Sequence, residues 1–323
     1  MNERGRVFRF VVKFKTGLPL SLQRMNKGAA ILQEMIYAKG YRHDETLRKS
    51  FCALANATFG IDFEEWYQKG FWNERYIPHS IVRQGQVVAN VSVNLLSLVI
   101  NGEKKKAIQI GTVMTHPDYR RQGLSARLMN QILEEYENEY EIMYLFANES
   151  VMDFYPRFGF RRVEELQFSA DIKPRPAIDR IGLRQLEISR HEDLDFIARF
   201  ASQRRPVSQR FGTEDSAGIF MFYALYVYGQ DLYYLEEEDV IVMYRHENEC
   251  LHMYDLVSKK EVDLKAIVEK LASVDTTKVV FYFTPEDEGI VTDRTAWDNG
   301  LFVRVNGDQL YPVKVNHPLT SIA

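Results

Sequence analysis

Apolar residues along the 323-residue chain recur at helix or strand spacing in two successive blocks. In the first block, Leu47, Phe51 and Leu54 fall on one helix face, and Asn101-Gly102 is a strong hairpin turn between two strand patterns. The run 142–147 is continuously apolar, which is typical of a strand buried on both faces. The expected elements are an apolar strand at 30–37, a helix at 44–58, strands at 80–83, 87–100 and 107–115, a helix from 124, a strand at 142–147, a short helix at 151–158 and a strand at 160–172.

The second block repeats part of this order after a charged segment at 173–180, whose two prolines and lack of periodicity are typical of a linker. Its expected elements are helices at 192–203 and 217–228, strands at 232–235, 240–245 and 250–257, a helix at 262–272, a strand at 279–283 and a terminal hairpin of 301–305 with 309–315. The pattern predicts an α/β (α+β) protein in which each block forms a mixed, mostly antiparallel sheet flanked by helices. The expected division is an N-terminal extension at 1–24, a domain at 25–172, a linker at 173–180 and a second domain at 181–323.

Composition excludes several classes of protein. The chain is 46% hydrophobic and 27% charged, and its net charge of −4 argues against a general nucleic-acid binder. Cys52 and Cys250 are far apart without metal-type spacing, which favours a reducing, cytoplasmic setting and no metal site. No apolar run approaches the roughly 20 residues that span a bilayer. The richest run, 219–228, is expected to be a buried helix rather than a membrane segment.

The segment 111–126 carries the chemistry. An apolar strand leads into Pro117, the turn Arg120-Arg121-Gln122-Gly123 and then an amphipathic helix. A glycine turn at a helix start leaves backbone N–H groups unpaired, and the helix dipole adds partial positive charge there. A pyrophosphate fits such a place, and the two arginines add charge-assisted hydrogen bonds. The alternative is a solvated helix start without a ligand.

Arg120-x-x-Gly123-x-Ser125 closely resembles motif A of the GCN5-related N-acetyltransferase (GNAT) superfamily, where Arg/Gln-x-x-Gly-x-Gly/Ala opens a helix after an apolar strand. Ser125 departs mildly from that pattern but is small. The resemblance implies acetyl-CoA as cosubstrate, with backbone groups of one strand along the pantetheine arm and those of the turn on the pyrophosphate. The implied cofactor-binding residues are Val113, Met114, Thr115, Arg120, Arg121, Gln122, Gly123, Leu124, Ser125, Ala126 and Asn148.

A second match to the same family lies downstream, where Asn148, Tyr155 and Gly159-Phe160 stand in the register of its fifth strand and following helix. The resemblance implies that Tyr155 is the general acid for the departing coenzyme A thiolate, because a phenol is protonated at neutral pH. The residues alone leave other roles open. Tyr155 is also compatible with a packed aromatic, and Asn148 with a helix cap.

Two further sets of residues are assigned structural roles. His116 is expected to be a turn residue rather than a base. Glu64, Glu65 and Trp66 are expected to lie on a solvated helix, although acceptors bind near such segments in similar folds. The acceptor site is expected to draw on the segment 58–79, the hairpin turns and the second domain.

The second block lacks the phosphate turn, since Ser258-Lys259-Lys260-Glu261 follows its corresponding strand and contains no glycine. We therefore expect a degenerate GNAT-like domain. A catalytic domain followed by a degenerate one is similar to the enhanced-intracellular-survival-type acetyltransferases. Those proteins add a sterol-carrier-like domain whose C-terminal carboxylate enters the active site. No such domain is expected here, and the carboxylate of Ala323 is expected to lie away from the first domain's site.

The sequence thus predicts a cytoplasmic acyltransferase that moves an acetyl group from acetyl-CoA to a primary amine of a small molecule or peptide by direct attack. A backbone N–H of Met114 or its neighbour would polarise the thioester carbonyl. The alternative is a non-catalytic acyl-CoA-binding sensor or scaffold. Neither a nucleic acid nor a membrane is expected as a partner, and a homo-oligomer stays open, as do the general base and the acceptor.

Overall fold

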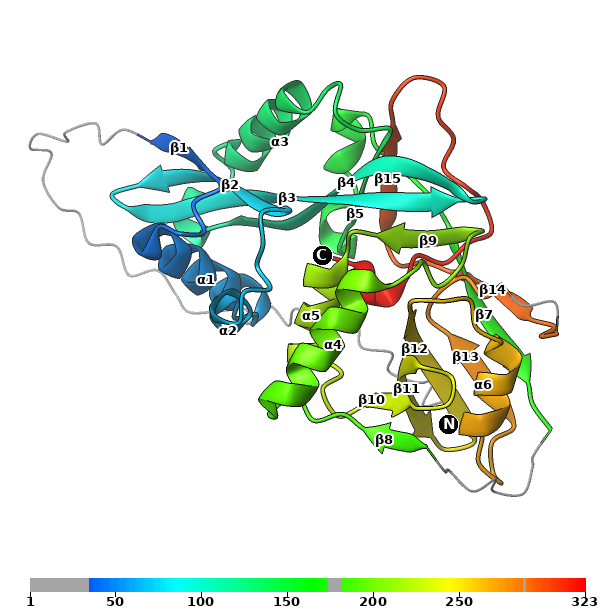
Figure 1. Cartoon of the computed structure of the whole chain (residues 1–323). Coiled ribbons are helices and arrows are strands. Elements are labelled where there is room, and N and C mark those ends of the chain that lie inside the picture. Colours follow the sequence, from blue (N-terminus) through cyan, green and yellow to red (C-terminus); the bar gives the residue numbers. More distant parts are fainter. Residues whose placement is uncertain (1–34, 174–181, 287–288) are drawn as a thin grey trace, which may run out of the picture.

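The computed structural model describes residues 35–173, 182–286 and 289–323 (Figure 1). The expected N-terminal extension at 1–24 lies outside these residues, and so does the expected linker apart from Lys173. The described residues form two sheets with helices on their faces, which confirms the predicted mixed α/β class. Among the described helices, none combines the length and the apolar character that a bilayer crossing requires.

The first sheet holds the strands around the predicted phosphate turn. Its order is β1-β2-β3-β4-β5-β15-β6, and β9 pairs with β3. The bounds are β1 Ile36–Lys39, β2 Tyr76–Arg83, β3 Gln86–Ile100, β4 Glu103–Thr115, β5 Ile142–Phe146, β6 Arg161–Arg162, β9 Phe211–Glu214 and β15 Leu301–Val305. All neighbouring pairs are antiparallel except β4 with β5, which is parallel.

Three helices flank this sheet: α1 Glu45–Phe59, α2 Glu64–Gln68 and α3 Leu124–Glu135. The predicted helix at 44–58 is confirmed as α1. The Asp44 side chain accepts a hydrogen bond from the Leu47 N–H, and Gly60 ends the helix in the left-handed region. On α3, Leu128, Met129 and Ile132 are completely buried against the sheet. The predicted short helix at 151–158 is instead a pair of 3₁₀ turns, Glu149–Val151 and Tyr155–Phe158.

The second sheet has the order β14-β7-β13-β12-β11-β10-β8. Its helices are α4, α5 and α6, and the predicted buried helix is confirmed as α5, in which Phe220 and Ala224 are fully enclosed. The bounds are β7 Glu165–Asp171, β8 Leu183–Gln185, α4 His191–Gln203, α5 Ala217–Tyr226, β10 Leu232–Leu235, β11 Val240–Glu247, β12 Cys250–Ser258, α6 Leu264–Leu271, β13 Lys278–Phe281 and β14 Asp293–Trp297.

The two sheets exchange strands, which differs from the expectation that each sheet comes from one continuous block. β7, expected in the first sheet, pairs with β13 and β14 in the second. β15 was expected to pair with 309–315 in a hairpin, and that prediction is wrong. It pairs with β5 of the first sheet, and 309–315 contains no strand. The apolar β5 is buried on both faces and has β4 on one edge only, so β15 satisfies the hydrogen-bonding groups of its other edge.

Glu165 of β7 is a buried carboxyl group at the junction of the two halves. It accepts a hydrogen bond from the His317 N–H at 2.7 Å, and its second oxygen is fully enclosed. Burial raises the pKa of Glu165 to about 8, against smaller lowerings by hydrogen bonds from the His317 N–H and the Asn299 side chain. The native carboxyl therefore keeps its proton at a pH where the unfolded chain has lost it.

The contribution of this carboxyl group to stability should therefore fall as the pH rises from about 4.5 to about 8, because Glu165 binds more protons in the native state than in the unfolded state in this range. We expect Glu165→Gln to abolish the part of this fall that lies between pH 6.5 and 8, on the order of 1 kcal/mol. Urea unfolding at these two pH values measures it. The buried His79 and His317, whose pKa burial lowers to about 4, are neutral in the native state throughout this window, and their titration in the unfolded chain is the same in every variant, so it cancels in the comparison. Glu164→Gln, at the exposed neighbour, is the control, and an equal fall in Glu165→Gln would contradict the assignment.

Candidate active site

A β-bulge in β4 marks the centre of the site. β3 pairs Ser92 with Gly111 and Asn90 with Met114, so two residues of β4, Thr112 and Val113, oppose one of β3. Thr112 has a φ of 47°, which is rare for a residue with a branched side chain. Such a conformation persists only where the surroundings hold it.

A buried polar network holds the bulge. The side-chain amide of Asn90 donates to the Thr112 carbonyl oxygen and to Ser92 Oγ, both at 2.9 Å. Its oxygen accepts from Ser80 Oγ at 2.8 Å, and Ser80 in turn is bonded to the Tyr41 hydroxyl. The Tyr76 hydroxyl hydrogen-bonds the Thr112 side chain. Asn90, Ser80 and Ser92 are completely buried, so these bonds are made without competition from water.

Beyond the bulge, one edge of β4 is free. The parallel pairing with β5 ends at Ile110 and Leu145. Within the described residues, no strand pairs with β4 on this side from Gly111 to Thr115. This free edge contains Val113, Met114 and Thr115, the residues expected to contact the pantetheine arm. An extended ligand could add to it as a further strand.

The turn before α3 has the geometry of an anion site. Arg121 (φ 62°) and Gly123 (φ 74°) are both left-handed, and Gly123 caps α3 without any side-chain hydrogen bond. The first N–H groups of a helix have no intrahelical acceptor, so those of Leu124, Ser125 and Ala126 are available to a ligand. Alternating left-handed residues turn successive N–H groups toward one concave side. Arg121, Gln122 and Gly123 are exposed.

The turn is fastened to the end of β4 by side chains. Ser125 Oγ and Thr115 Oγ1 are hydrogen-bonded at 2.8 Å, and the Arg120 Nε donates to the Thr115 carbonyl oxygen at 3.2 Å. The Gln122 side chain donates to the Asp118 carbonyl oxygen at 3.2 Å. Ser125, a departure from the family motif, therefore has a contact that glycine or alanine could not make. The role of Thr115 in this contact was not foreseen from the sequence.

Tyr155 is buried beside the same helix and strand. Its ring packs against Phe154, Phe160 and Phe302, in the core cluster that also contains Met129 and Leu145. Among the described residues none hydrogen-bonds its hydroxyl. The hydroxyl oxygen is also not completely enclosed by the protein. Burial raises the pKa of Tyr155 to about 12. The phenol is thus protonated and has a free hydrogen to donate.

Asn148 is exposed at the end of β5. It occupies the N-cap position of the 3₁₀ turn Glu149–Val151, but its side chain makes no capping hydrogen bond. The Ala147 N–H donates to the Gly300 carbonyl oxygen at 2.8 Å. A Cβ on Gly300 would lie 2.2 Å from the Ala147 carbonyl oxygen, so glycine is required for this close approach just before β15.

His116 is a turn residue, as expected. It caps the 3₁₀ turn Pro117–Tyr119, where its Nδ1 accepts from the Asp118 N–H at 3.3 Å. Its ring lies edge-on to Tyr119.

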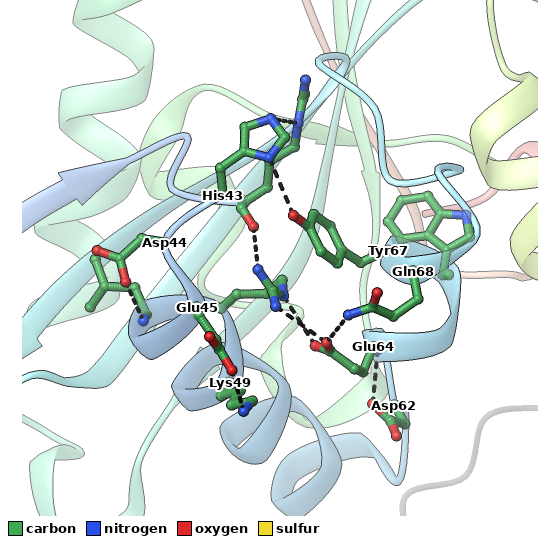
Figure 2. Close-up of polar contacts among 12 residues, drawn as sticks. His43, Asp44, Glu45, Lys49, Asp62, Glu64, Tyr67 and Gln68 are labelled. Carbon is green, nitrogen blue, oxygen red and sulfur yellow. Dashed lines mark hydrogen bonds and ion pairs between the residues drawn. The ribbon is translucent and has the colours of Figure 1, made fainter.

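The expectation of a solvated helix at 64–66 holds only in part, and it is wrong for Trp66. Figure 2 shows Glu64 accepting from Gln68, with the Asp62 side chain accepting from the Glu64 N–H. Glu64 is also paired with the buried Arg48 at 3.1 Å, and this hydrogen bond lowers the pKa of its carboxyl. Glu64 therefore has a structural partner already.

Trp66 is 2% exposed and joins the two halves of the chain. Its indole N–H donates to the Gly218 carbonyl oxygen of α5 at 2.7 Å, and its backbone N–H donates to the Tyr226 hydroxyl at 3.0 Å. Phe222 of α5 joins the same aromatic cluster. Trp66 of the short α2 is buried because it packs against α5, which no local pattern in the sequence indicates.

The expectation that Ala323 lies away from the first site is also wrong. A Cβ on Gly111 would lie 3.0 Å from the Ala323 carbonyl oxygen and 3.4 Å from its Cβ. Ala323 therefore touches β4 at the first residue beyond its pairing with β5. The reason is tertiary, since the Tyr223 hydroxyl of α5 donates to the Ile322 carbonyl oxygen and holds this segment between the sheets.

The corresponding helix of the second half has no free N-terminus. α6 follows β12 as α3 follows β4, but the Asp263 side chain caps it by accepting from the Ala266 N–H at 2.8 Å. The carboxylate takes the place of an anionic ligand. In the part of the chain that the structure describes, no group of His, Cys, Asp and Glu could hold a metal ion.

Asn90→Ala should destabilise the protein by about 2–4 kcal/mol, because it leaves buried partners of the network unsatisfied. It should also weaken any ligand that uses the free edge of β4, since the Thr112 carbonyl is released. Urea unfolding measures the first effect. A mutant as stable as the wild type would contradict the role given to Asn90.

Comparison with known proteins agrees with this geometry. The family model described as an acetyltransferase (GNAT) domain matches residues 42–163, which contain β4, the turn and Tyr155. None of the curated proteins matches the chain.

Several solved structures are similar over most of the chain. A conserved protein of unknown function from Enterococcus faecalis, described as a probable N-acyltransferase, is 14% identical, with 84% of this chain and 72% of that chain covered and a TM-score of 0.55. Eis1 from Mycobacterium abscessus is 16% identical, with 84% and 74% covered and a TM-score of 0.55. A GCN5-related N-acetyltransferase from Kribbella flavida is 18% identical, with 86% and 72% covered and a TM-score of 0.51. At these identities the likeness shows a shared two-sheet fold.

Proposed function

We propose that this protein is an acetyl-CoA-dependent N-acetyltransferase for a primary amine of a small molecule or peptide, because the acetyltransferase (GNAT) domain model matches residues 42–163. The observation that carries the proposal is the free edge of β4 leading directly into an uncapped helix start. The pantetheine arm would lie along Val113, Met114 and Thr115. The N–H groups from Arg121 to Ala126 would hold the pyrophosphate, with Arg120 and Arg121 adding charge. The exposed Asn148 would contact the cofactor from β5.

The bulge identifies a candidate oxyanion donor. The carbonyl oxygen of Thr112 is held by Asn90 on the β3 side. In a trans peptide the following N–H points the opposite way, and no cis peptide occurs in the described residues. The Val113 N–H, next to Met114, is therefore directed to the free edge, where the thioester carbonyl would lie. One fixed donor at this atom would stabilise the negative charge that develops on the oxygen.

Tyr155 would serve the leaving group. The neutral amine attacks the thioester carbon, the C–S bond breaks, the nitrogen loses one proton to solvent, and the thiolate receives one. A thiol has a pKa of about 8.5, so complete transfer from a phenol with a pKa of about 12 costs about 5 kcal/mol. A hydrogen bond from the phenol to the departing sulfur stabilises the negative charge that develops there without complete proton transfer, so this cost is avoided. We therefore assign Tyr155 chiefly the stabilisation of the thiolate, with the proton supplied as the sulfur departs.

Incubation with acetyl-CoA and a panel of amines, followed by detection of free thiol, tests the activity directly. Calorimetry with coenzyme A tests the site. Binding without turnover on any amine would favour an acyl-CoA sensor or scaffold instead, and failure to bind would refute both readings.

Gly123→Ala should weaken coenzyme A binding about tenfold or more, because a Cβ at φ 74° strains the turn that presents the N–H groups. Gly102→Ala is a matched control. Gly102 has a φ of 80° and, like Gly123, has nothing within 4 Å of its Cβ position, but it lies in the β3–β4 hairpin turn. Calorimetry should show unchanged affinity for Gly102→Ala. Equal losses in both variants would mean that general destabilisation, and not the turn, sets the affinity.

Tyr155→Phe should lower kcat about 10²-fold and leave the affinity for coenzyme A within about twofold, since the hydroxyl acts only as the C–S bond breaks. Steady-state kinetics and calorimetry measure the two effects. Tyr144→Phe removes another buried tyrosine hydroxyl that has no partner among the described residues, and it should leave kcat unchanged. Unchanged turnover in Tyr155→Phe would place the proton donor elsewhere.

A further inference from the structure

The second sheet repeats the strand arrangement of the candidate site. β12 is antiparallel to β11 and parallel to β13, as β4 is to β3 and β5. The β11–β12 pairing passes from Asp255 to Met253 and leaves Tyr254 as an extra residue, so β12 also has a bulge. The pairing with β13 ends at Met253 and Phe281, next to this bulge. The edge of β12 beyond Met253 therefore corresponds to the free edge of β4.

In the second sheet this edge is occupied by the chain itself. The segment 316–323, here called the arm, contains residues that are almost completely buried: Asn316, His317, Thr320 and Ser321. Its Leu319 N–H donates to the Tyr282 carbonyl oxygen at 3.0 Å, just after β13. On the other side, the Thr320 hydroxyl donates to the Asp255 carboxylate of β12. The arm thus lies between β12 and the continuation of β13, where a cofactor arm would lie in the first sheet.

The contact with Asp255 is strongly built. Asp255 is 1% exposed, and Arg204 binds both of its carboxylate oxygens at 2.7 Å. The Arg204 guanidinium also lies over the ring of Phe220 of α5. A paired buried carboxylate of this kind holds a hydroxyl donor more firmly than a neutral acceptor would. Thr320 is therefore the fixed point of the arm.

The arm then crosses to the first sheet (Figure 1). Ser321 Oγ is bonded to Thr213 Oγ1 of β9 at 2.7 Å, and Ala323 reaches Gly111. Neighbouring residues of a strand face opposite sides of a sheet. Ile110 packs in the cluster of α3, so Gly111 and Ala323 lie on the other face, with Met114, Trp66 and Tyr76.

We infer that the second sheet, instead of binding a second cofactor, clamps the arm so that Ile322 and Ala323 form one wall of the acceptor side of the first site. The inference rests on the proposed function, in which the cofactor phosphates lie at the N-terminus of α3, just after β4. The acceptor must then approach the thioester from the face on which Ala323 lies. Thr320 is a positioning residue that acts through this wall.

The number of cofactor sites gives the first test. Calorimetry of the full chain with coenzyme A should give one site per chain, because the arm fills the second edge and Asp263 caps α6. Two sites would overturn the inference. Absence of binding would overturn the proposed function and this inference with it, so the two failures are distinguishable.

Substitution of Thr320 gives the second test. Thr320→Val keeps the shape and removes the hydroxyl, and Thr320→Ser restores it. We expect Thr320→Val to raise KM for the acceptor amine at least fivefold, to leave coenzyme A affinity within twofold and to speed amide hydrogen exchange at 319–323. Thr320→Ser should restore all three values. Thr276→Val is the matched control, because Thr276 is equally buried and accepts the Ser273 N–H in a loop of the same half.

An unchanged KM in Thr320→Val, or equal changes in Thr276→Val, would overturn the inference. Ala323→Leu provides a second variant that leaves the buried contacts of Thr320 intact. It should raise KM more for bulky amines than for small ones, again without changing coenzyme A affinity. A uniform response to all amines would exclude a wall at this position.

Discussion

The hydrogen bond from Asn90 to the Thr112 carbonyl oxygen is the constraint on which the candidate site depends. It holds a threonine in the left-handed region, keeps the bulge in β4 and directs the next N–H to the free edge. Since Asn90, Ser80 and Ser92 are buried, the network that holds the bond is well shielded from water. A strand without this bulge would present a regular ladder, with no single donor placed for a thioester.

The N-terminus of α3 completes the site because its first N–H groups have no capping side chain. Gly123 provides no side-chain cap, so a ligand can supply the missing acceptors. The second half shows the contrary case. Asp263 caps α6, and the arm lies along the edge of β12, so the same arrangement of strands is closed by groups of the chain itself. The same arrangement of strands thus leaves a free edge in one half and an edge covered by the arm in the other.

The two halves do not act as separate units. They exchange β7 and β15, Trp66 is bonded to α5, and the arm ends against Gly111. The Glu165 carboxyl, buried where β7 meets the arm, adds a pH-dependent contribution to this junction. A substitution in the second half can therefore alter the surroundings of β4 without changing β4 or the turn before α3.

The sequence by itself determined what depends on neighbours in the chain. Several features could be predicted from the sequence because capping, periodicity and backbone freedom are local properties. They are the turn Arg120–Gly123, the helix after it, the apolar β5 and the spacing of Asn148 and Tyr155. The missing glycine after β12 likewise predicted that the second half has no phosphate turn.

Only the tertiary structure decided which edges pair and what lies against the site. Four features depend on contacts between residues that are far apart in the sequence or on different strands. They are the pairing of β15, the burial of Trp66, the network around Asn90 and the position of Ala323. Strand pairing leaves little mark on composition, since one apolar strand suits several edges equally well. What selected among them was the need of every buried N–H, carbonyl and hydroxyl for a partner, which is met only when the whole chain is folded.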